Sequence, residues 1–516
     1  MIILASEFLK NLISKGYFPQ EITPWFGTNN LSSILDDSEI SHNLSGFSPR
    51  TSKASRYSLP KGKSTRRLLS IPNPLHYLRL CKVLNDEWSY LRGLISDSQI
   101  SLTIPSERAR SLRALSRKFS FKDISEKIIR SSTSSRYLLR TDISRYYSTI
   151  YTHSLPWAIH TKPIAKARKN DMTLIGNKID KAIQNCQDGQ TNGIPIGPDT
   201  SLLISELLCS SMDKEIKDIK YNAAFRYIDD YFLFFDSLSD AEKAFSDLHK
   251  IIRGYELELN PYKTKIIRLP EPLEPQWVSI LDNTPRNSSG LLSYISKIFE
   301  YSNIYPEDEV IKYGLSKIKN LRIGETQKDI LLSFLLNVIL HEPSAIPLAC
   351  EMLVTINKNQ PVSTQINDNI QETLLFNAEY NNDFELTWLL WLCNILNIDV
   401  NENVAKKISN IDNPFIALAT LYLNNKGLIT QGLDISFWAS MMKKEELYEE
   451  NWILAYEANI QGWLPSVSGT DYVMEDPFFK LLKTKNIKFF NPDAHLEWNL
   501  KPVNEKWLYS EFSPAF

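Results

Sequence analysis

Two adjacent aspartates, Asp229 and Asp230, interrupt an apolar and aromatic stretch that runs from residue 224 to residue 235. Each half of this stretch is long enough for a buried strand. An acidic break between two such runs predicts a β-hairpin with the aspartates at its tip. Asp is also common in ordinary turns, because its side chain hydrogen-bonds the nearby backbone. The chemistry of the hairpin therefore depends on what the rest of the chain places beside it.

The chain of 516 residues can form more than one domain, and its apolar (43%) and charged (23%) fractions are ordinary for a globular protein. Its five cysteines include no CxxC pair, which argues against a disulfide framework and a zinc site. The N-terminus lacks the basic region of a signal peptide, and no apolar run reaches the ~18 residues of a membrane helix. We therefore expect a cytoplasmic protein that does not enter a membrane.

Positive charge is concentrated between Arg50 and Arg130, where eighteen Lys and Arg residues stand against six Asp and Glu residues. This surplus of twelve leaves about −14 for the rest of the chain, because the total is −2. A solvated basic face would by itself explain such a segment. A surplus of this size in a chain with a carboxylate hairpin favours contact with phosphates.

The basic segment contains a second predicted hairpin, over residues 57–74. Two short strands flank a Gly-containing turn rich in cations and end at Ile-Pro-Asn-Pro. Arg66 and Arg67 carry planar guanidinium groups that match phosphate oxygens, and lysines in the turn add point charges. This hairpin is a candidate triphosphate clamp, and the sequence leaves open which arginine points inward.

Helices and loops are expected around the two hairpins. Helical patterns cover residues 1–20, 75–95, 105–130 and 238–253, and residues 29–58 predict a serine-rich loop. A Gly/Pro loop over residues 191–200 leads into a helix from residue 201 to about 212, with Asp199 or Thr200 as N-cap. Residues 257–267 predict a strand, a turn and a strand.

Beyond about residue 285 the sequence becomes a leucine-rich helical pattern. The predicted helices cover residues 308–320, 326–341, 344–357, 366–378, 382–397, 402–409, 413–424 and 444–460. Their starts suggest helix pairs with a period of about 35–40 residues, as in stacked helical repeats. No residue recurs at a fixed place in each period, so an irregular helical bundle is the alternative.

A third carboxylate, Asp142, ends an apolar strand predicted over residues 137–142. On neighbouring strands of one sheet, Asp142 and Asp229 would converge at one edge, and clustered aspartates repel one another unless a cation is bound. Phosphoryl transfer uses two divalent ions about 4 Å apart, and Mg²⁺ prefers oxygen ligands, among which the carbonyl of Ile143 is a further candidate. The alternative is that the two aspartates cap separate turns.

The order of these elements resembles the fingers and palm of reverse transcriptases over about residues 50–270. The matching stretches are the basic hairpin with Arg66, Arg67 and Ile71-Pro72-Asn73, the segment from Asp142 to Tyr147, the box Tyr227-Ile228-Asp229-Asp230, and Leu259-Asn260 with Lys263-Thr264. The resemblance implies an α+β fingers and palm unit, an antiparallel sheet with helices, over residues 1–285. It also implies an all-α helical-repeat (HEAT-like) domain in place of a thumb over residues 286–516.

The resemblance also implies roles for single residues. Metal binding falls to Asp142, Ile143, Asp229 and Asp230, catalysis to Asp142, Asp229, Asp230 and Lys263, and nucleotide binding to Arg66, Arg67, Tyr147, Asn192 and Gly193. Tyr147 matches the aromatic gate under the sugar, where a ring would clash with a 2′-hydroxyl. A packed aromatic residue is the alternative for Tyr147, and a solvated lysine for Lys263. The implied cofactor is Mg²⁺ in a two-metal site, with Mn²⁺ as the alternative, and the implied substrates are deoxynucleoside triphosphates.

The loop over residues 192–198 departs from the templated retroelement enzymes, which usually have Gln-Gly and, five residues after the Gln, Ser-Pro. Here the same positions hold Asn192-Gly193 and Gly197-Pro198. This form resembles the bacterial defence-associated reverse transcriptases of the abortive-infection class (AbiK and AbiA types), in which a helical, repeat-like domain follows the palm. That resemblance implies antiphage defence, untemplated synthesis of single-stranded DNA attached to a priming tyrosine, homo-oligomers and a bacterial cytoplasmic location.

A priming tyrosine must bring its hydroxyl to the metal site, so it should lie on a mobile or cavity-lining segment. The chain has 23 tyrosines, and Tyr17, Tyr57, Tyr472 and Tyr509 lie near predicted loops. Each of them can equally be a surface or packing residue.

Two other functions stay open. A templated reverse transcriptase of the retron or intron type predicts a basic thumb after the palm, whereas the region here is helical and net acidic. A non-catalytic defence scaffold with a relict palm predicts the loss of the aspartates, which this chain retains at positions 142, 229 and 230.

Overall fold

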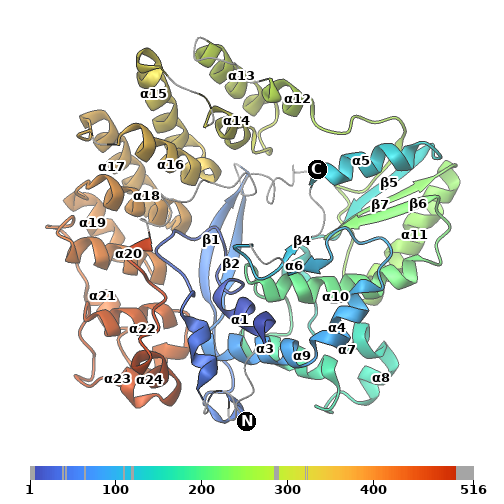
Figure 1. Cartoon of the computed structure of the whole chain (residues 1–516), viewed down its shortest axis with the longest axis horizontal. Helices are drawn as coiled ribbons and strands as arrows, with labels where there is room; N and C mark the ends of the chain where they lie inside the picture. The colour runs from blue at the N-terminus through green and yellow to red at the C-terminus, as the bar shows by residue number, and fades with distance from the viewer. Residues whose placement is uncertain are drawn as a thin grey trace.

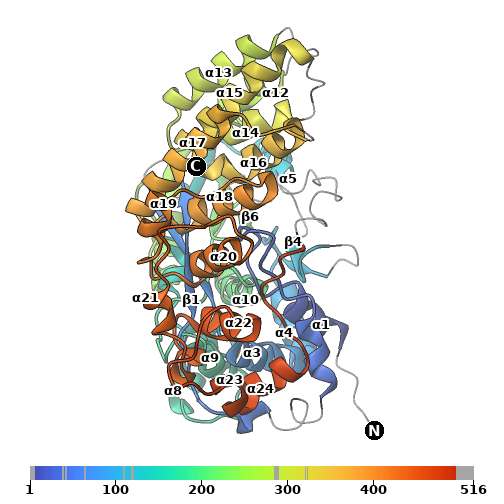
Figure 2. The same cartoon turned by 90° about the vertical axis from the view of Figure 1, so that its left-hand side faces the viewer.

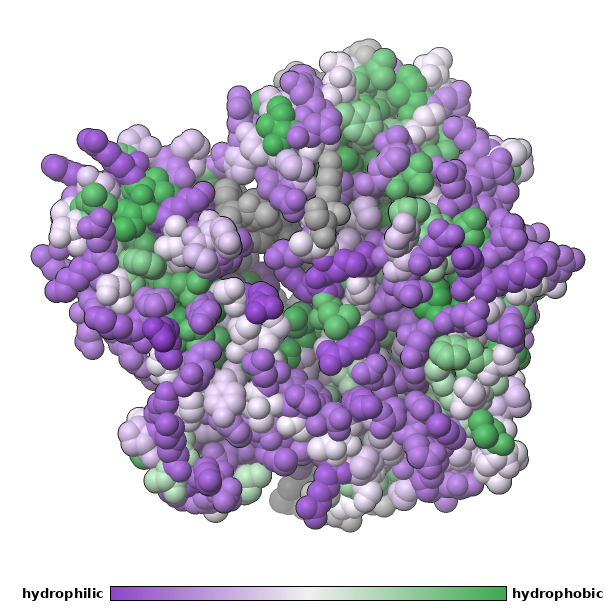
Figure 3. Space-filling view, turned by 180° about the vertical axis from the view of Figure 1, so that it is seen from behind, coloured by the Kyte–Doolittle hydropathy of each residue, from purple (hydrophilic) through white to green (hydrophobic). Residues whose placement is uncertain are grey.

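The structure is a computed structural model, and it describes residues 6–37, 40, 44–62, 65–107, 111–117, 121–283, 290–319, 321, 324–358 and 360–494. Within these ranges, no helix combines the length and the apolar character that a membrane crossing requires. On the face opposite that of Figure 1, hydrophilic residues predominate and the hydrophobic ones lie in separate groups (Figure 3).

A four-stranded antiparallel sheet in the order β6-β7-β5-β8 lies at one side of the molecule (Figure 1). Its strands are β5 (Tyr137–Asp142), β6 (Ala223–Tyr227), β7 (Asp230–Phe235) and β8 (Lys265–Arg268). Successive side chains point to opposite faces of a sheet. One face packs on α5 (Phe121–Ser132), and the other on α11 (Leu238–Gly254), which itself contacts α10 (Asp199–Ile216). The expected hairpin and the strand before Asp142 are therefore confirmed.

The basic hairpin consists of β1 (Ser55–Lys61) and β2 (Thr65–Ile71), paired antiparallel along their whole length. Helices α3 (Pro74–Asp86) and α4 (Trp88–Ser96) follow it, as expected, and α1 (Glu7–Ser14) packs on α3. The short 3-10 helices η1 (Leu31–Asp36) and η2 (Leu44–Gly46) occupy the serine-rich segment. The helices between β5 and β6, besides α10, are α6 (Tyr146–Thr149), α7 (Ser154–His160), α8 (Lys162–Ala167) and α9 (Ile175–Asn185).

Of the two strands expected over residues 257–267, only the second, β8, forms, and Leu259 makes an isolated bridge with Ile143. Two further local predictions are wrong. The first part of the helix expected over residues 105–130 forms a small ladder of β3 (Pro105–Ser106) and β4 (Ser116–Arg117). The N-cap of α10 is Pro198, and Asp199 is already helical. One contact explains both results: the buried Asp199 carboxylate accepts hydrogen bonds from the Arg113 guanidinium and from the Leu115 backbone N–H, which draws this segment out of a helix.

The remaining helices form the helical region, defined here as α12 to α24. They are α12 (Gln276–Asp282), α13 (Leu291–Ile304), α14 (Val310–Ile318), α15 (Glu325–His341), η4 (Pro343–Ala345), α16 (Ile346–Ile356), α17 (Thr364–Glu379), α18 (Asp383–Leu396), α19 (Glu402–Ile408), α20 (Pro414–Asn425), α21 (Ser436–Ala439), η5 (Lys444–Tyr448), α22 (Trp452–Gln461), α23 (Tyr472–Glu475) and α24 (Pro477–Thr484). Helices α14, α16, α18, α20 and α22 contact one another in succession, and so do α13, α15, α17 and α19. The helical region therefore stacks in two rows, in chain order from one end of the molecule to the other (Figure 2).

The helical region lies against the basic hairpin, which stands between it and the central sheet (Figure 1). Strand β1 contacts α18, and the Trp452 indole N–H donates to the carbonyl of Ile71 at the end of β2. Helix α12 packs on α13 and α14, so the helical packing begins near residue 276. The boundary after residue 285 and the relation of the helix pairs to HEAT-like repeats stay predictions.

Candidate active site

The turn between β6 and β7 places two carboxylates at the end of the sheet. Tyr227 pairs with Asp230, so the turn itself consists of Ile228 and Asp229, and Asp230 is the first residue of β7. Ile228 has a φ of 58°, which is strained for a β-branched residue. Its backbone is held on both sides: the Arg226 guanidinium donates to the Ile228 carbonyl (2.7 Å), and the Ile228 N–H donates to Thr103 Oγ1 (3.1 Å). The fold therefore fixes the direction in which Asp229 leaves the turn.

The third carboxylate arrives on the neighbouring strand. Asp142, the last residue of β5, lies directly opposite Asp230 in the ladder, and directly opposed residues point to the same face of a sheet. Asp142 is 7% exposed, whereas Asp229 and Asp230 are half-buried. We call Asp142, Asp229 and Asp230 the carboxylate site. The structure thus brings together the three aspartates that the sequence singled out.

The carboxylate site holds more negative charge than its surroundings neutralise. Burial, followed by the charge of Asp142, raises the pKa of Asp229 to about 6. Burial, followed by the charge of Asp229, raises the pKa of Asp230 to about 7. One buried oxygen of Asp142, Oδ1, accepts no hydrogen bond from the part of the chain that the structure describes. A buried carboxylate oxygen without a partner is costly, and a cation would relieve both the repulsion and the missing contact.

Lys263 provides one positive charge at this site. Its Nζ lies 3.0 Å from Oδ2 of Asp142. The turn that carries it is tied to β5, because the Asn260 N–H donates to the Asp142 carbonyl (2.8 Å) and Ile143 forms a bridge with Leu259. Ile143 thus follows Asp142 at the strand end, and its carbonyl as a metal ligand stays a prediction.

The site fits Mg²⁺ better than a metal enclosed by protein ligands. No three His, Cys, Asp or Glu side chains in the described ranges converge closely enough to hold a metal by themselves. Mg²⁺ usually binds through one or two carboxylates and completes its shell with water and phosphate oxygens. The hard carboxylate oxygens of the carboxylate site and the orphaned Oδ1 of Asp142 match that mode.

The two arginines of the basic hairpin have different surroundings. Arg66 forms a bidentate ion pair with Glu385 of α18, with Nη1–Oε1 and Nη2–Oε2 distances of 2.7 and 2.8 Å. Arg67 lies close enough to Asp229 to lower the pKa of that carboxyl, against the larger effect of burial. Lys61 shares the electrostatic surroundings of Arg67. Burial and then the charge of Arg67 lower the pKa of Lys61, whereas the charges of Asp229 and Asp142 raise it. The sequence did not single out Lys61, whose charge interacts with Asp229, as that of Arg67 does.

Tyr147 and the 192–193 loop lie against each other beside the carboxylate site. The half-buried Tyr147 ring has its hydroxyl 3.3 Å from Ser205 Oγ, and its pKa is raised by burial and also, to a smaller degree, by Asp229. The Ile194 N–H donates to the Tyr147 carbonyl (2.9 Å). Gly193 has a φ of 81°, and a Cβ there would meet the Ser148 carbonyl oxygen at 3.1 Å, so glycine is needed. The exposed Asn192 forms a bridge with Tyr151.

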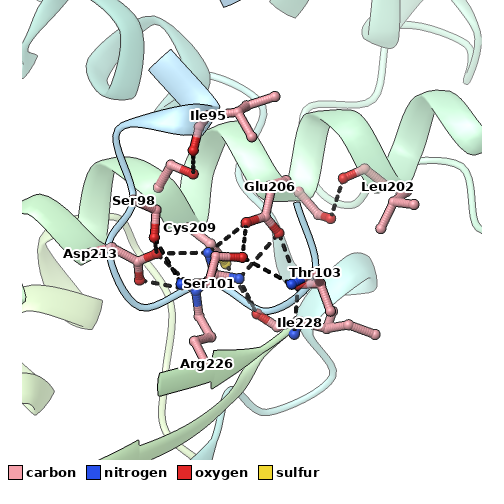
Figure 4. Close-up of polar contacts among 12 residues, drawn as sticks. Ile95, Ser98, Ser101, Thr103, Leu202, Glu206, Cys209, Asp213, Arg226 and Ile228 are labelled. Carbon is pink, nitrogen blue, oxygen red and sulfur yellow. Dashed lines mark hydrogen bonds and ion pairs between the residues drawn. The ribbon is translucent and has the colours of Figure 1, made fainter. Parts of the chain in front are cut away.

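Behind the turn lies a buried ion cluster that sequence reasoning missed (Figure 4). We call Arg226, Glu206 and Asp213 the arginine cluster; all three side chains are almost fully buried. Arg226 donates to both oxygens of Glu206 (2.8 and 3.2 Å) and both oxygens of Asp213 (2.7 to 3.1 Å). The available signal was a pair of acids seven residues apart in and just after the helix expected over residues 201–212, a spacing that places both on one face of α10.

The comparison with protein families agrees with this geometry. Residues 59–301 match the family model described as "Reverse transcriptase (RNA-dependent DNA polymerase)". Among solved structures, the apo telomerase from Candida tropicalis aligns with 14% sequence identity and a TM-score of 0.29, covering 77% of this chain and 73% of that one. A search of curated proteins gave no match. The chain therefore contains a reverse transcriptase domain, which includes the carboxylate site and all of the basic hairpin except the first four residues of β1.

Proposed function

We propose that the protein is a Mg²⁺-dependent DNA polymerase that extends a tyrosine of its own chain without a template and acts in antiphage abortive infection. A reverse transcriptase domain implies nucleotidyl transfer from nucleotide substrates to a nucleic acid product, in general with a divalent metal. The observation that carries the polymerase assignment is the carboxylate site itself, where Asp142 lies opposite Asp230, next to Asp229, and the buried Oδ1 of Asp142 has no hydrogen-bond partner among the described residues. The defence role and the absence of a template rest on the resemblance of the 192–198 loop.

In this function the carboxylate site would hold the metal, which when bound favours deprotonation of the attacking hydroxyl and offsets charge on the triphosphate. Lys263 would meet the leaving pyrophosphate, and the distance of 3.0 Å between its ammonium and Asp142 supports this role. Arg67 and Lys61 would bind the triphosphate from the basic hairpin, since their charges reach Asp229. Tyr147 and Gly193 would shape the sugar pocket from the opposite side.

Burial argues against most of the tyrosines that lie near predicted loops as primers. Tyr17, Tyr57 and Tyr472 are at most 1% exposed, and their hydroxyls contact the Pro72 carbonyl, Thr387 Oγ1 and the Ala455 carbonyl. Tyr509 lies outside the described residues. Tyr262 is 91% exposed and adjoins Lys263, so among the described tyrosines it is the best candidate to bring a hydroxyl to the carboxylate site.

The decisive test is to incubate purified protein with Mg²⁺ and radiolabelled deoxynucleotides without template or primer. We expect label that stays with the protein on a denaturing gel, shifts after protease treatment and is absent in Asp229→Ala. Mass spectrometry of the labelled peptide then identifies the tyrosine, with Tyr262→Phe as the first variant to lose the label. The defence role is tested separately, by phage challenge of bacteria that express either the wild type or Asp229→Ala.

A second candidate is a templated reverse transcriptase, which the matched family description favours through the words "RNA-dependent". This function predicts incorporation only when an RNA template and an annealed primer are added, with a product whose length follows the template. The position of the helical region against the basic hairpin supports the first proposal, because α18 occupies one side of the hairpin. Incorporation under neither condition, with defence intact in cells, would leave a scaffold role.

A further inference from the structure

We propose that Glu385, in the first turn of α18, is a positioning residue for the nucleotide site. By holding Arg66, it fixes the basic hairpin in the orientation that turns Arg67 and Lys61 toward the carboxylate site. The inference rests on the proposed nucleotide-binding function and adds a role for the helical region in substrate affinity.

The Arg66–Glu385 ion pair attaches the basic hairpin to α18. The Glu385 side chain is 1% exposed, and both of its oxygens accept from the Arg66 guanidinium. Arg66 also donates to Ser58 on the partner strand, through Nε to Oγ (2.6 Å) and through Nη2 to the carbonyl (2.9 Å). One guanidinium thus ties both strands of the hairpin to α18, and a buried carboxylate such as Glu385 strongly disfavours the loss of its partner.

Further contacts attach the same hairpin to the helical region. The Ser58 N–H donates to Asp383 (2.8 Å), and the Tyr57 hydroxyl lies 2.6 Å from Thr387 Oγ1, so the first turn of α18 meets β1 at two more points. At the turn, Gly62 has a φ of 60°, and a Cβ there would lie 2.9 Å from a carboxylate oxygen of Glu307. The helical region therefore contacts the basic hairpin both along β1 and at its turn.

Strand geometry connects this anchor to the active site. Neighbouring residues of a strand point to opposite faces, so a guanidinium at position 66 that is fixed on α18 sends position 67 to the other face. Lys61 pairs with Thr65, two residues before Arg67, so Lys61 and Arg67 share that other face. The hairpin stands between the helical region and the central sheet (Figure 1), and the charge of Arg67 lowers the pKa of Asp229 while the charge of Asp229 raises the pKa of Lys61. A hairpin released from α18 could rotate, and Arg67 would then meet the triphosphate less often.

The test compares Glu385→Gln with a matched control, Glu351→Gln. Glu351 is also a mostly buried acid of the helical region, and its ion-pair partner Lys319 lies in the helical region and not in the hairpin. Binding of α,β-methylene-dATP with Mg²⁺ is measured by calorimetry on the full chain, and KM and kcat are measured by incorporation. We expect Glu385→Gln to weaken binding and raise KM about tenfold with kcat within about twofold, as Arg67→Ala does, whereas Glu351→Gln binds like the wild type.

Two further variants separate positioning from general destabilisation. Replacing the pair by Arg66→Met with Glu385→Met keeps a packed contact without charge, and we expect nucleotide affinity within about threefold of the wild type. Arg66→Lys keeps the charge but loses the bidentate fork, and serves if Glu385→Gln does not fold. The inference is overturned if Glu385→Gln, or Arg66→Lys in its place, binds like the wild type while Arg67→Ala does not. It is also overturned if Glu351→Gln loses as much affinity as Glu385→Gln.

The failure of the proposed function is recognised independently. A wild-type protein that binds the nucleotide analogue but incorporates no nucleotide contradicts the polymerase assignment, and the positioning role of Glu385 is then decided by the binding data alone. A wild-type protein that binds no nucleotide contradicts both.

Discussion

Two groups of carboxylates lie close to the same β6–β7 hairpin, and they differ in how their negative charge is compensated. In the arginine cluster, all four oxygens of Glu206 and Asp213 accept hydrogen bonds, and the Arg226 guanidinium reaches each of them. In the carboxylate site, Lys263 forms an ion pair with Asp142, and the other oxygen of Asp142 has no hydrogen-bond partner among the described residues.

This difference separates a structural use of charge from a functional one. A buried acid that only supports the fold is best paired with a fixed cation, because the pair then needs nothing from outside. An acid that must bind a metal and release a product has to keep an oxygen available. The two groups are also connected, since Arg226 donates to the carbonyl of Ile228, whose strained turn presents Asp229.

The largest expected effect comes from Asp142→Asn in the carboxylate site. We expect incorporation to fall by roughly a thousandfold or more, because a metal ligand is worth several kcal/mol in the transition state. The melting temperature without metal should stay the same or rise, because one of the repelling charges is removed. Incorporation assays and thermal unfolding of the same preparation check both parts. If the variant does not fold, Asp142 stabilises the fold, and the contrast between the carboxylate site and the arginine cluster does not hold.

The next largest effect is expected from Arg226→Met in the arginine cluster. Removing the cation leaves Glu206 and Asp213 buried without their partner, which should lower the free energy of unfolding by about 3–5 kcal/mol. Urea unfolding measures this loss. Arg268→Met, at an exposed arginine on β8, is the matched control and should change stability by less than about 0.5 kcal/mol. Equal stability of the two variants would mean that the arginine cluster does not stabilise the fold.

Metal binding should produce a smaller, conditional effect. At a free Mg²⁺ concentration of about 100 times Kd, the wild type should gain about 2.7 kcal/mol of stability, because the metal binds the folded state. Asp229→Asn should lose most of this stabilisation by Mg²⁺. The folded molecules of Arg226→Lys should keep it, because this change does not touch the carboxylate site. Melting curves with Mg²⁺ and with a chelator provide the measurement. A gain of the same size in Asp229→Asn would place the metal elsewhere.

Glu457 is a third kind of buried acid, one that protonation keeps uncharged, and we expect the smallest effect from it. Burial raises its pKa to about 8, against the lowering effect of backbone N–H groups of Phe489 and Phe490. A raised carboxyl pKa gives stability that is fully present below the unfolded value near 4.5 and is lost as the pH rises through about 8. Glu457→Gln should therefore change the stability little near pH 4 and should become increasingly stabilising as the pH rises toward 9. The measurement is the free energy of unfolding of the wild type and of Glu457→Gln as a function of pH. If the two curves run parallel, Glu457 is not protonated in the folded state.

Much of the fold follows from local pattern. The eight helices expected after residue 308 all occur, because apolar residues at helical spacing recur over each of them, although the last one is divided into η5 and α22. The wrong predictions near α10 have a non-local cause: residues 105–106 and 111–117 leave the helical pattern because Arg113 and Leu115 donate to Asp199, 86 and 84 residues further along. Such partners cannot be read from a window of neighbouring residues.

By itself, the sequence determined the hairpins, the helical region and the identity of the three aspartates, because strand alternation, helical periodicity and motif order are local properties of the chain. Only the tertiary structure decided which of Arg66 and Arg67 faces the carboxylate site. The two residues are equivalent in the sequence, and strand geometry requires only that they point to opposite faces. The choice is made by Glu385, 319 residues away, since a buried carboxylate binds the guanidinium that the packing of α18 brings to it.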